Sequence, residues 1–136
     1  MNQTELDQPL DDLFELYIKQ SLDELPQDYI ANLNNVAITT ADYPDVYQTK
    51  KSSLKNGQLL LGLYEGIPLS RRGTGTTMAL PDKITLFRIP LLKVSKSSSE
   101  LQAKIKQTLW HEIAHYYGLN HHDMAKLQQA NKQAKL

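Results

Sequence analysis

One stretch near the C-terminal end of the chain constrains the fold most strongly. Residues 111–121 read His-Glu-Ile-Ala-His-Tyr-Tyr-Gly-Leu-Asn-His, which is the pattern H-E-x-x-H-x-x-G-x-x-H. In a helix, residues four positions apart project from one face about one turn apart. His111 and His115 can therefore bind the same zinc ion. The stretch predicts a helix that carries a metal site.

The residues around this pair have types that suit a catalytic zinc site. Glu112 stands beside the first predicted ligand, where it can accept a proton from a water molecule instead of binding the metal. Gly118 is suited to end the helix, because glycine readily adopts the left-handed conformation. The chain can then turn and bring His121 back as a third ligand. Three protein ligands leave a fourth position open, which is typical of a catalytic site.

The metal-binding helix is predicted over residues 98–117. At about 100° per residue, one apolar stripe contains Leu101, Ile105, Leu109, Ile113 and Tyr116. His111 and His115 fall nearly opposite the centre of that stripe. We therefore expect both histidines to face a cleft that holds a metal; the alternative is a pair of polar histidines that bind none. Trp110 is expected to pack in the core.

Composition excludes several classes of protein. The 136 residues carry 15 basic and 15 acidic side chains, so there is no excess positive charge for nucleic acid or an anionic membrane. The chain has no cysteine, which excludes disulfides and thiolate metal sites. The acidic N-terminal segment lacks the pattern of a signal peptide, and no stretch approaches the ~20 apolar residues of a membrane span. We expect a cytoplasmic protein with no nucleic-acid or membrane partner.

The hydrophobic patterns predict an α+β fold in one domain over residues 1–136. Helices are expected over residues 10–25, 26–32, 98–117 and 123–133. Short strands are expected over residues 36–40, 59–64 and 83–89, forming a small three-stranded sheet. Residues 1–9 are expected to be a flexible lead-in, and residues 41–56 a loop. Residues 70–78 are expected to form a surface loop or a lid near the zinc. The patterns do not indicate an oligomeric state.

Three segments together resemble the small bacterial zincin-like metallopeptidases. Residues 61–69 read Leu-Gly-Leu-Tyr-Glu-Gly-Ile-Pro-Leu, residues 81–88 read Pro-Asp-Lys-Ile-Thr-Leu-Phe-Arg, and residues 111–118 complete the set. The resemblance covers about residues 10–130. It implies a minimal zincin-like domain with Zn²⁺ as its cofactor and a peptide or protein as its substrate. It also implies that one of the three strands binds an extended substrate as an added strand, although the sequence does not indicate which.

The sequence departs from that family at the predicted third ligand. Members often have aspartate where His121 stands, and here the chain reads His121-His122-Asp123. Imidazole and carboxylate both bind zinc, so all three side chains are candidates. We favour His121, followed by Asp123 and then His122. No glutamate follows Glu112 in the chain, which excludes a ligand set of two histidines and a downstream glutamate.

These observations favour zinc-dependent hydrolysis of peptide bonds, with Glu112 as the general base. A weakly active or inactive zinc-binding regulatory module is the first alternative, because a chain this short leaves little room for a second lobe. A zinc-dependent endoribonuclease is the second alternative. One bacterial rRNA-processing family shares the spacing of His111, His115 and His121. That family typically has glycine where Glu112 stands, and zero net charge disfavours strong RNA binding.

Overall fold

A computed structural model describes the backbone of residues 3–52, 57–68, 81–119, 122–123 and 126. In chain order the elements are α1 (Gln3–Glu24), α2 (Gln27–Ala31), β1 (Val36–Ala41), α3 (Val46–Lys51), β2 (Gly62–Glu65), β3 (Asp82–Phe87), α4 (Arg88–Lys93) and α5 (Ser98–Tyr117). The three strands form one sheet beside the helices, which confirms the predicted α+β class.

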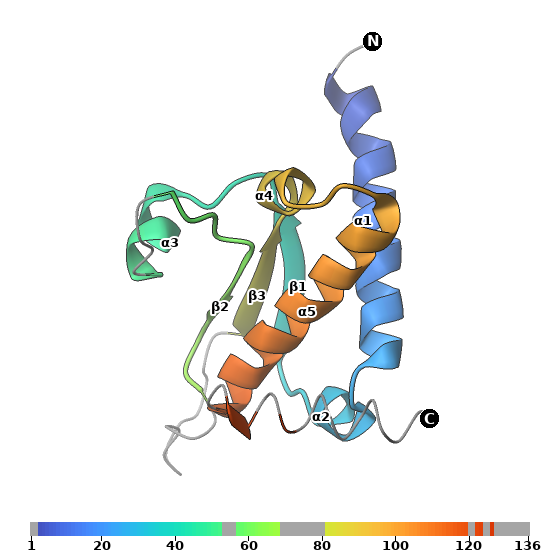
Figure 1. The fold of residues 1–136 in the computed structure, drawn as a ribbon. Coiled ribbons are helices and arrows are strands. Elements are labelled where there is room, and N and C mark those ends of the chain that lie inside the picture. Colours follow the sequence, from blue (N-terminus) through green and yellow to red (C-terminus); the bar gives the residue numbers. More distant parts are fainter. Residues whose placement is uncertain (1–2, 53–56, 69–80, 120–121, 124–125, 127–136) are drawn as a thin grey trace.

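The described strands form a mixed sheet in the order β1-β3-β2. β1 runs parallel to β3, with Ile38 opposite Ile84, and β2 runs antiparallel to β3, with Tyr64 opposite Ile84. The central strand β3 is therefore the most buried of the three. Among the described strands, β2 lies at one edge of the sheet, as Figure 1 shows.

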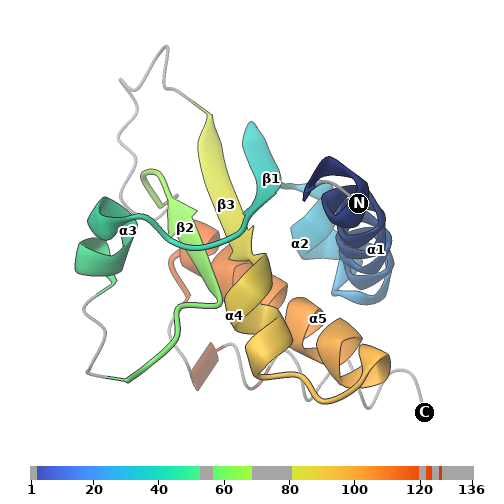
Figure 2. The same ribbon diagram turned by 90° about the horizontal axis from the view of Figure 1, so that it is seen from above.

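The core lies between the sheet and α5, which crosses one face of the sheet with α1 alongside (Figures 1 and 2). One buried cluster contains Phe14, Leu86, Leu91, Leu101 and Ile105. A second contains Leu25, Ile84, Leu109, Trp110 and Ile113. Each large apolar side chain removed from water contributes about 1.5–3 kcal/mol. The predicted apolar stripe of α5 and the predicted core position of Trp110 are both confirmed.

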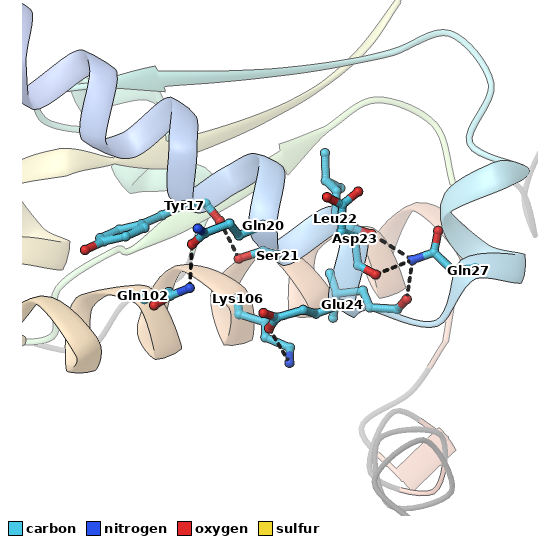
Figure 3. A network of polar contacts seen from close by, with 10 residues as sticks. Tyr17, Gln20, Ser21, Leu22, Asp23, Glu24, Gln27, Gln102 and Lys106 are labelled. Atoms are coloured by element: carbon cyan, nitrogen blue, oxygen red, sulfur yellow. Dashed lines mark hydrogen bonds and ion pairs between the residues drawn. The ribbon is translucent and has the colours of Figure 1, made fainter. Parts of the chain in front are cut away.

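Polar contacts connect α1 with α5 along their exposed side (Figure 3). The Gln102 side chain donates to Gln20 over 2.6 Å, and the Lys106 ammonium donates to Glu24 over 3.0 Å. Pairs of this kind contribute little to stability when water reaches them. Apolar burial therefore holds the two helices together, and the polar contacts favour one alignment of α1 on α5.

Both ends of α5 have defined caps, and its bounds agree with the predicted residues 98–117. At the start, the Ser97 hydroxyl accepts from the backbone N–H of Glu100 over 3.1 Å. At the end, Gly118 has φ 77°, as its predicted role as a helix stop requires. The N–H of Leu119 donates to the Ala114 carbonyl over 3.0 Å, which is the long hydrogen bond of a Schellman motif.

Two helices differ from the prediction: α1 begins earlier than expected, and α3 lies in a segment that was expected to be a loop. α1 begins at Gln3, so residues 3–9, expected as a flexible lead-in, are helical and include Pro9. α3 lies inside the segment 41–56 that was expected to be a loop. Its cause is a capping box, in which the Asp45 carboxylate accepts from the Gln48 backbone and the Gln48 side chain accepts from the Asp45 backbone.

The predicted second and third strands also differ in their bounds. β2 is shorter and later than the expected residues 59–64, because only Gly62–Glu65 pair with β3. β3 ends at Phe87, and Arg88 already begins α4. Pro90 is the third residue of that helix, where its missing N–H costs nothing because the first turn has no intrahelical acceptors.

Several predicted features lie outside the described residues. These are the segment 70–78, His121 and most of the C-terminal helix predicted over residues 123–133. Of that helix, Asp123 and Lys126 are described and are helical, as is His122 just before it. Within the described part of the chain, none of the helices combines the length and apolar character that crossing a membrane requires.

Candidate metal centre

The side chains of His111, Glu112 and His115 converge on α5. Their candidate ligand atoms all lie within 4.8 Å of one another, and the two imidazole rings have centroids 4.7 Å apart. His111 is half-buried and His115 is exposed, whereas Glu112 is only 7% exposed. Helical spacing therefore brings together three of the predicted site residues, with the histidines on the open side and the carboxylate turned inward.

This arrangement fits a zinc ion. Two imidazole nitrogens bound to one zinc at about 2.0–2.1 Å lie no more than about 4.2 Å apart, so the observed limit of 4.8 Å requires only a small side-chain adjustment. Nitrogen donors suit zinc. Of the candidates for the third ligand, His121 lies outside the described residues. In the helical turn beyond Gly118, His122 is exposed and Asp123 is half-buried.

Glu112 is held by strand β2. The backbone N–H of Tyr64 donates to the Glu112 Oε1 atom over 2.9 Å. This N–H is available because of the register of β2. Leu63 pairs with Thr85, and the neighbouring Leu61 carbonyl accepts from Phe87 over 2.9 Å. Leu61 and Leu63 thus belong to the hydrogen-bonded pairs of this antiparallel ladder. The alternate residues, Gly62 and Tyr64, direct their N–H and C=O groups away from β3.

The position of Tyr64 is fixed in turn by its side chain. Its hydroxyl donates to Asp82 Oδ2 over 2.6 Å, and Asp82 is buried at 4% exposure. Its ring meets that of Tyr116 edge to face, with centroids 6.1 Å apart. The amide that binds Glu112 is therefore anchored to both β3 and α5.

Burial changes the acidity of Glu112. Loss of contact with water raises the pKa of this carboxyl from its ordinary 4.5 to about 7, and the hydrogen bond from the Tyr64 amide opposes that rise. Desolvation disfavours the charged form, while an N–H donor favours it. Before any metal binds, Glu112 therefore exchanges its proton near neutral pH, which suits a group that must accept and release one.

A cleft of about 340 Å³ lies directly beside this cluster. It is lined by Leu60, Leu61, Gly62, Gln107, Thr108, His111 and Glu112. One wall thus comes from β2 and the residues before it, and the other from the turn of α5 that carries the first histidine and the preceding turn. The candidate metal centre stands at one end of this cleft.

β2 and α5 run in the same direction and stay in step along the cleft. Gly62 lies against Thr108, and Tyr64 contacts Glu112. Two strand residues advance about 6.6 Å and four helix residues about 6 Å. Every second residue of β2 therefore meets every fourth residue of α5 in this part of the cleft. A Cβ at Gly62 would lie 2.7 Å from the Thr108 methyl carbon Cγ2. Only glycine permits this close approach of strand to helix.

Sequence reasoning did not identify three of the residues at this site. Gln107 precedes His111 by four positions, so the helical spacing that predicted the metal pair also places Gln107 on the same face. No sequence pattern of this kind marks Gly62 or the Tyr64 amide as part of the site. Their roles depend on how β2 approaches α5, a contact between segments 48 residues apart at Tyr64 and Glu112.

The fold and the site together define an α+β protein with a candidate metal site of the H-E-x-x-H kind. Residues 33–130 match the family described as Zincin-like metallopeptidase, and the chain belongs to that family. This confirms the resemblance found in the sequence.

A solved structure has a similar fold. It is the conserved hypothetical protein TTHA0227 from Thermo thermophilus, with a TM-score of 0.51 and 20% sequence identity. The match covers 77% of this chain and 91% of that chain. At this identity the similarity concerns the fold alone. A comparison with curated proteins finds no match.

Proposed function

We propose that this protein is a zinc-dependent metallopeptidase. His111, His115 and His121 hold the zinc ion, and Glu112 is the general base. The observation that carries the proposal is the placement of Glu112, which is buried beside the two histidines, tied to the Tyr64 amide and open to a cleft. A structural zinc site has no need of a base or of an adjoining cleft.

The reaction requires one proton to move twice. A zinc ion held by the histidines would polarise the scissile carbonyl as a Lewis acid and would lower the pKa of a water molecule. Glu112 takes a proton from the water that attacks the carbonyl carbon, and it then gives that proton to the amine as the C–N bond breaks. One oxygen of Glu112 accepts from Tyr64, which orients the carboxylate while its second oxygen carries the proton.

An extended peptide is the substrate that suits the cleft. The N–H and C=O groups of Gly62 point away from β3 in the same way as those of Tyr64. They lie at the wall of the cleft that ends at Glu112. A peptide that adds to this edge of β2 places its backbone alongside α5. We propose β2 as the strand that binds substrate.

The test compares the wild-type protein with Glu112→Gln, after measuring zinc in both by elemental analysis. The amide keeps the size and the hydrogen bond to Tyr64 but cannot accept a proton. We expect about one zinc per chain in both proteins. We also expect peptide cleavage at least about 100-fold slower in the variant, the low end of general-base contributions.

Two outcomes contradict the proposal. Full activity of Glu112→Gln with zinc bound would exclude this carboxylate as the base. Zinc binding by the wild-type protein without turnover of any unstructured peptide would favour the alternative of an inactive binding module. RNA cleavage assayed on the same preparation separates the peptidase from an endoribonuclease.

A further inference from the structure

The cleft beside the metal centre has an end that the proposed chemistry does not use. Its far part is formed by Leu60, Leu61, Gly62 and Thr108. We infer that this part is a specificity pocket for an apolar side chain of the substrate, and that Gln107 at its rim determines which side chains enter. This inference rests on the proposed function, because it assumes a peptide in the cleft.

Apart from the Thr108 hydroxyl and the backbone of Gly62, the groups that form the pocket are apolar. Leu60 and Leu61 are half-buried, and the methyl group of Thr108 faces Gly62. Among the residues that line the cleft, the ionisable ones are His111 and Glu112, both at the metal end. A charged side chain in the far end would lose its hydration without gaining a partner. An apolar side chain would gain burial, and the volume of about 340 Å³ is at the lower end of ligand pockets.

The distance between the pocket and the metal centre indicates which residue of the substrate places its side chain in the pocket. Thr108 and Gln107 each lie four positions before a residue of the metal centre, Glu112 and His111 respectively. Four helix residues advance about 6 Å, whereas an extended peptide advances about 3.3 Å per residue. The side chain in the pocket therefore belongs to a residue within two positions of the bond that is cut.

Gln107 is placed to control entry without taking part in the chemistry. It is exposed at the rim of the cleft and lies on the same helix face as His111 and His115. Its neutral amide carries no charge into the pocket. A charge at this position would attract side chains of opposite sign at short range, where such interactions are strongest.

The experiment measures side-chain preference in three proteins. Wild-type protein, Gln107→Lys and Gln107→Glu are given a peptide mixture in which every position is varied, and the products are sequenced by mass spectrometry. In wild type we expect Leu, Met or Phe to exceed Asp and Lys at least tenfold at one position within two residues of the cut. Gln107→Lys should raise the use of Asp and Glu there about tenfold, and Gln107→Glu that of Lys and Arg.

Ala103→Lys is the matched control. Ala103 is exposed on α5 and lies one turn before Gln107 on the same helix face, but it does not line the cleft. It adds the same charge as Gln107→Lys one turn further from the pocket. We expect its preference to equal that of wild type, so a general effect of net charge would be recognised.

A second readout separates the pocket from the catalysis. The zinc-loaded Glu112→Gln protein is titrated with fluorescent peptides that differ only in carrying Leu, Asp or Lys at each position in turn. Tighter binding of the Leu peptide, altered by Gln107→Lys, supports the pocket even if no preparation cleaves peptides and the proposed function fails. Cleavage without side-chain preference, or a preference that Gln107 does not affect, overturns the pocket and leaves the peptidase intact. Absence of both binding and cleavage overturns both.

Discussion

Two effects act in opposite directions on the pKa of the Glu112 carboxyl. Burial at 7% exposure favours its protonated form, and the N–H of Tyr64 favours its ionised form. Burial dominates, since the pKa of the carboxyl rises to about 7. A carboxylate in this situation is maintained at a cost in folding free energy, as functional groups often are.

That cost predicts a pH dependence in the metal-free protein. The unfolded chain releases this proton near pH 4.5 and the folded chain near 7. The folded state therefore binds more protons between these values, and its stability declines as pH rises from about 4.5 to 7, by about 3 kcal/mol from this group. Urea unfolding in the presence of a chelator, repeated across this pH range, measures the decline.

The Glu112→Gln variant isolates the contribution of this carboxyl, because every other titrating group is retained. We expect the variant to be more stable than wild type at pH 7. Its free energy of unfolding should fall much less than that of wild type as the pH rises from about 4.5 to 7. Equal pH dependence in the two proteins would show that Glu112 titrates normally in the folded chain.

At the scale of single residues, the motif predicted the convergence of His111, Glu112 and His115 because helical geometry fixes the relation of residues four apart. It could not predict the hydrogen bond from Tyr64. That bond comes from a backbone amide, which every residue except proline possesses, so no side-chain pattern marks it. The raised pKa of Glu112 was equally beyond prediction, because it results from tertiary burial.

Among the secondary-structure elements, α5 contributes most to the site, and its C-terminal end determines where the chain goes next. The left-handed conformation of Gly118 and the hydrogen bond from Leu119 to Ala114 turn the chain out of the helix. Any third ligand beyond this point depends on the direction of that turn.

We predict that Gly118→Ala lowers stability by about 1–2 kcal/mol, because a Cβ is disfavoured at φ 77°. It should also weaken zinc binding by about tenfold, the effect typical of losing a supporting contact. Urea unfolding and competition with a chromogenic chelator measure the two effects. Gly57→Ala is the control, since Gly57 also has a positive φ of 82° but does not line the cleft. Unchanged zinc affinity in Gly118→Ala would refute the link.

Elements without a strong apolar period were harder to predict. The capping box of α3 is present in the sequence as Asp45 and Gln48, three residues apart, but the polar character of this segment, which contains Pro44, predicted a loop. Pro90 was expected to close a strand that reaches residue 89, but the strand ends at Phe87 and Pro90 lies in the first turn of α4, where a proline permits a helix. The long apolar period therefore predicted α5 well, whereas the short helices α3 and α4 were missed.

For the molecule as a whole, the sequence predicted the α+β class from the order of the elements, but the order of the strands was not predictable. β1 pairs with β3, which is more distant in the sequence than β2. That choice depends on long-range packing of strands such as Val36–Ala41 against Asp82–Phe87. The pattern of each strand contains no information about its partner.

Zinc should stabilise the whole fold, because the ligands adopt their relative positions only in the folded chain. A ligand at 100 times its dissociation constant adds about 2.7 kcal/mol, which for a chain of this size raises the melting temperature by about 10 °C. Differential scanning calorimetry with zinc and with a chelator measures the shift. His121→Ala should abolish the shift, and Asp123→Ala should retain it. The reverse result would assign the third ligand to Asp123.

The matched advance of β2 and α5 restricts how this chain can change its length during evolution. One residue inserted in β2 before Tyr64 would direct the Tyr64 amide toward β3, and one residue inserted in α5 before Glu112 would rotate the carboxylate by about 100°. Neither change compensates the other, because two strand residues correspond to four helix residues. We therefore expect insertions and deletions to be tolerated in the connections before Gly62 and between β2 and β3, which lie outside this pair of elements.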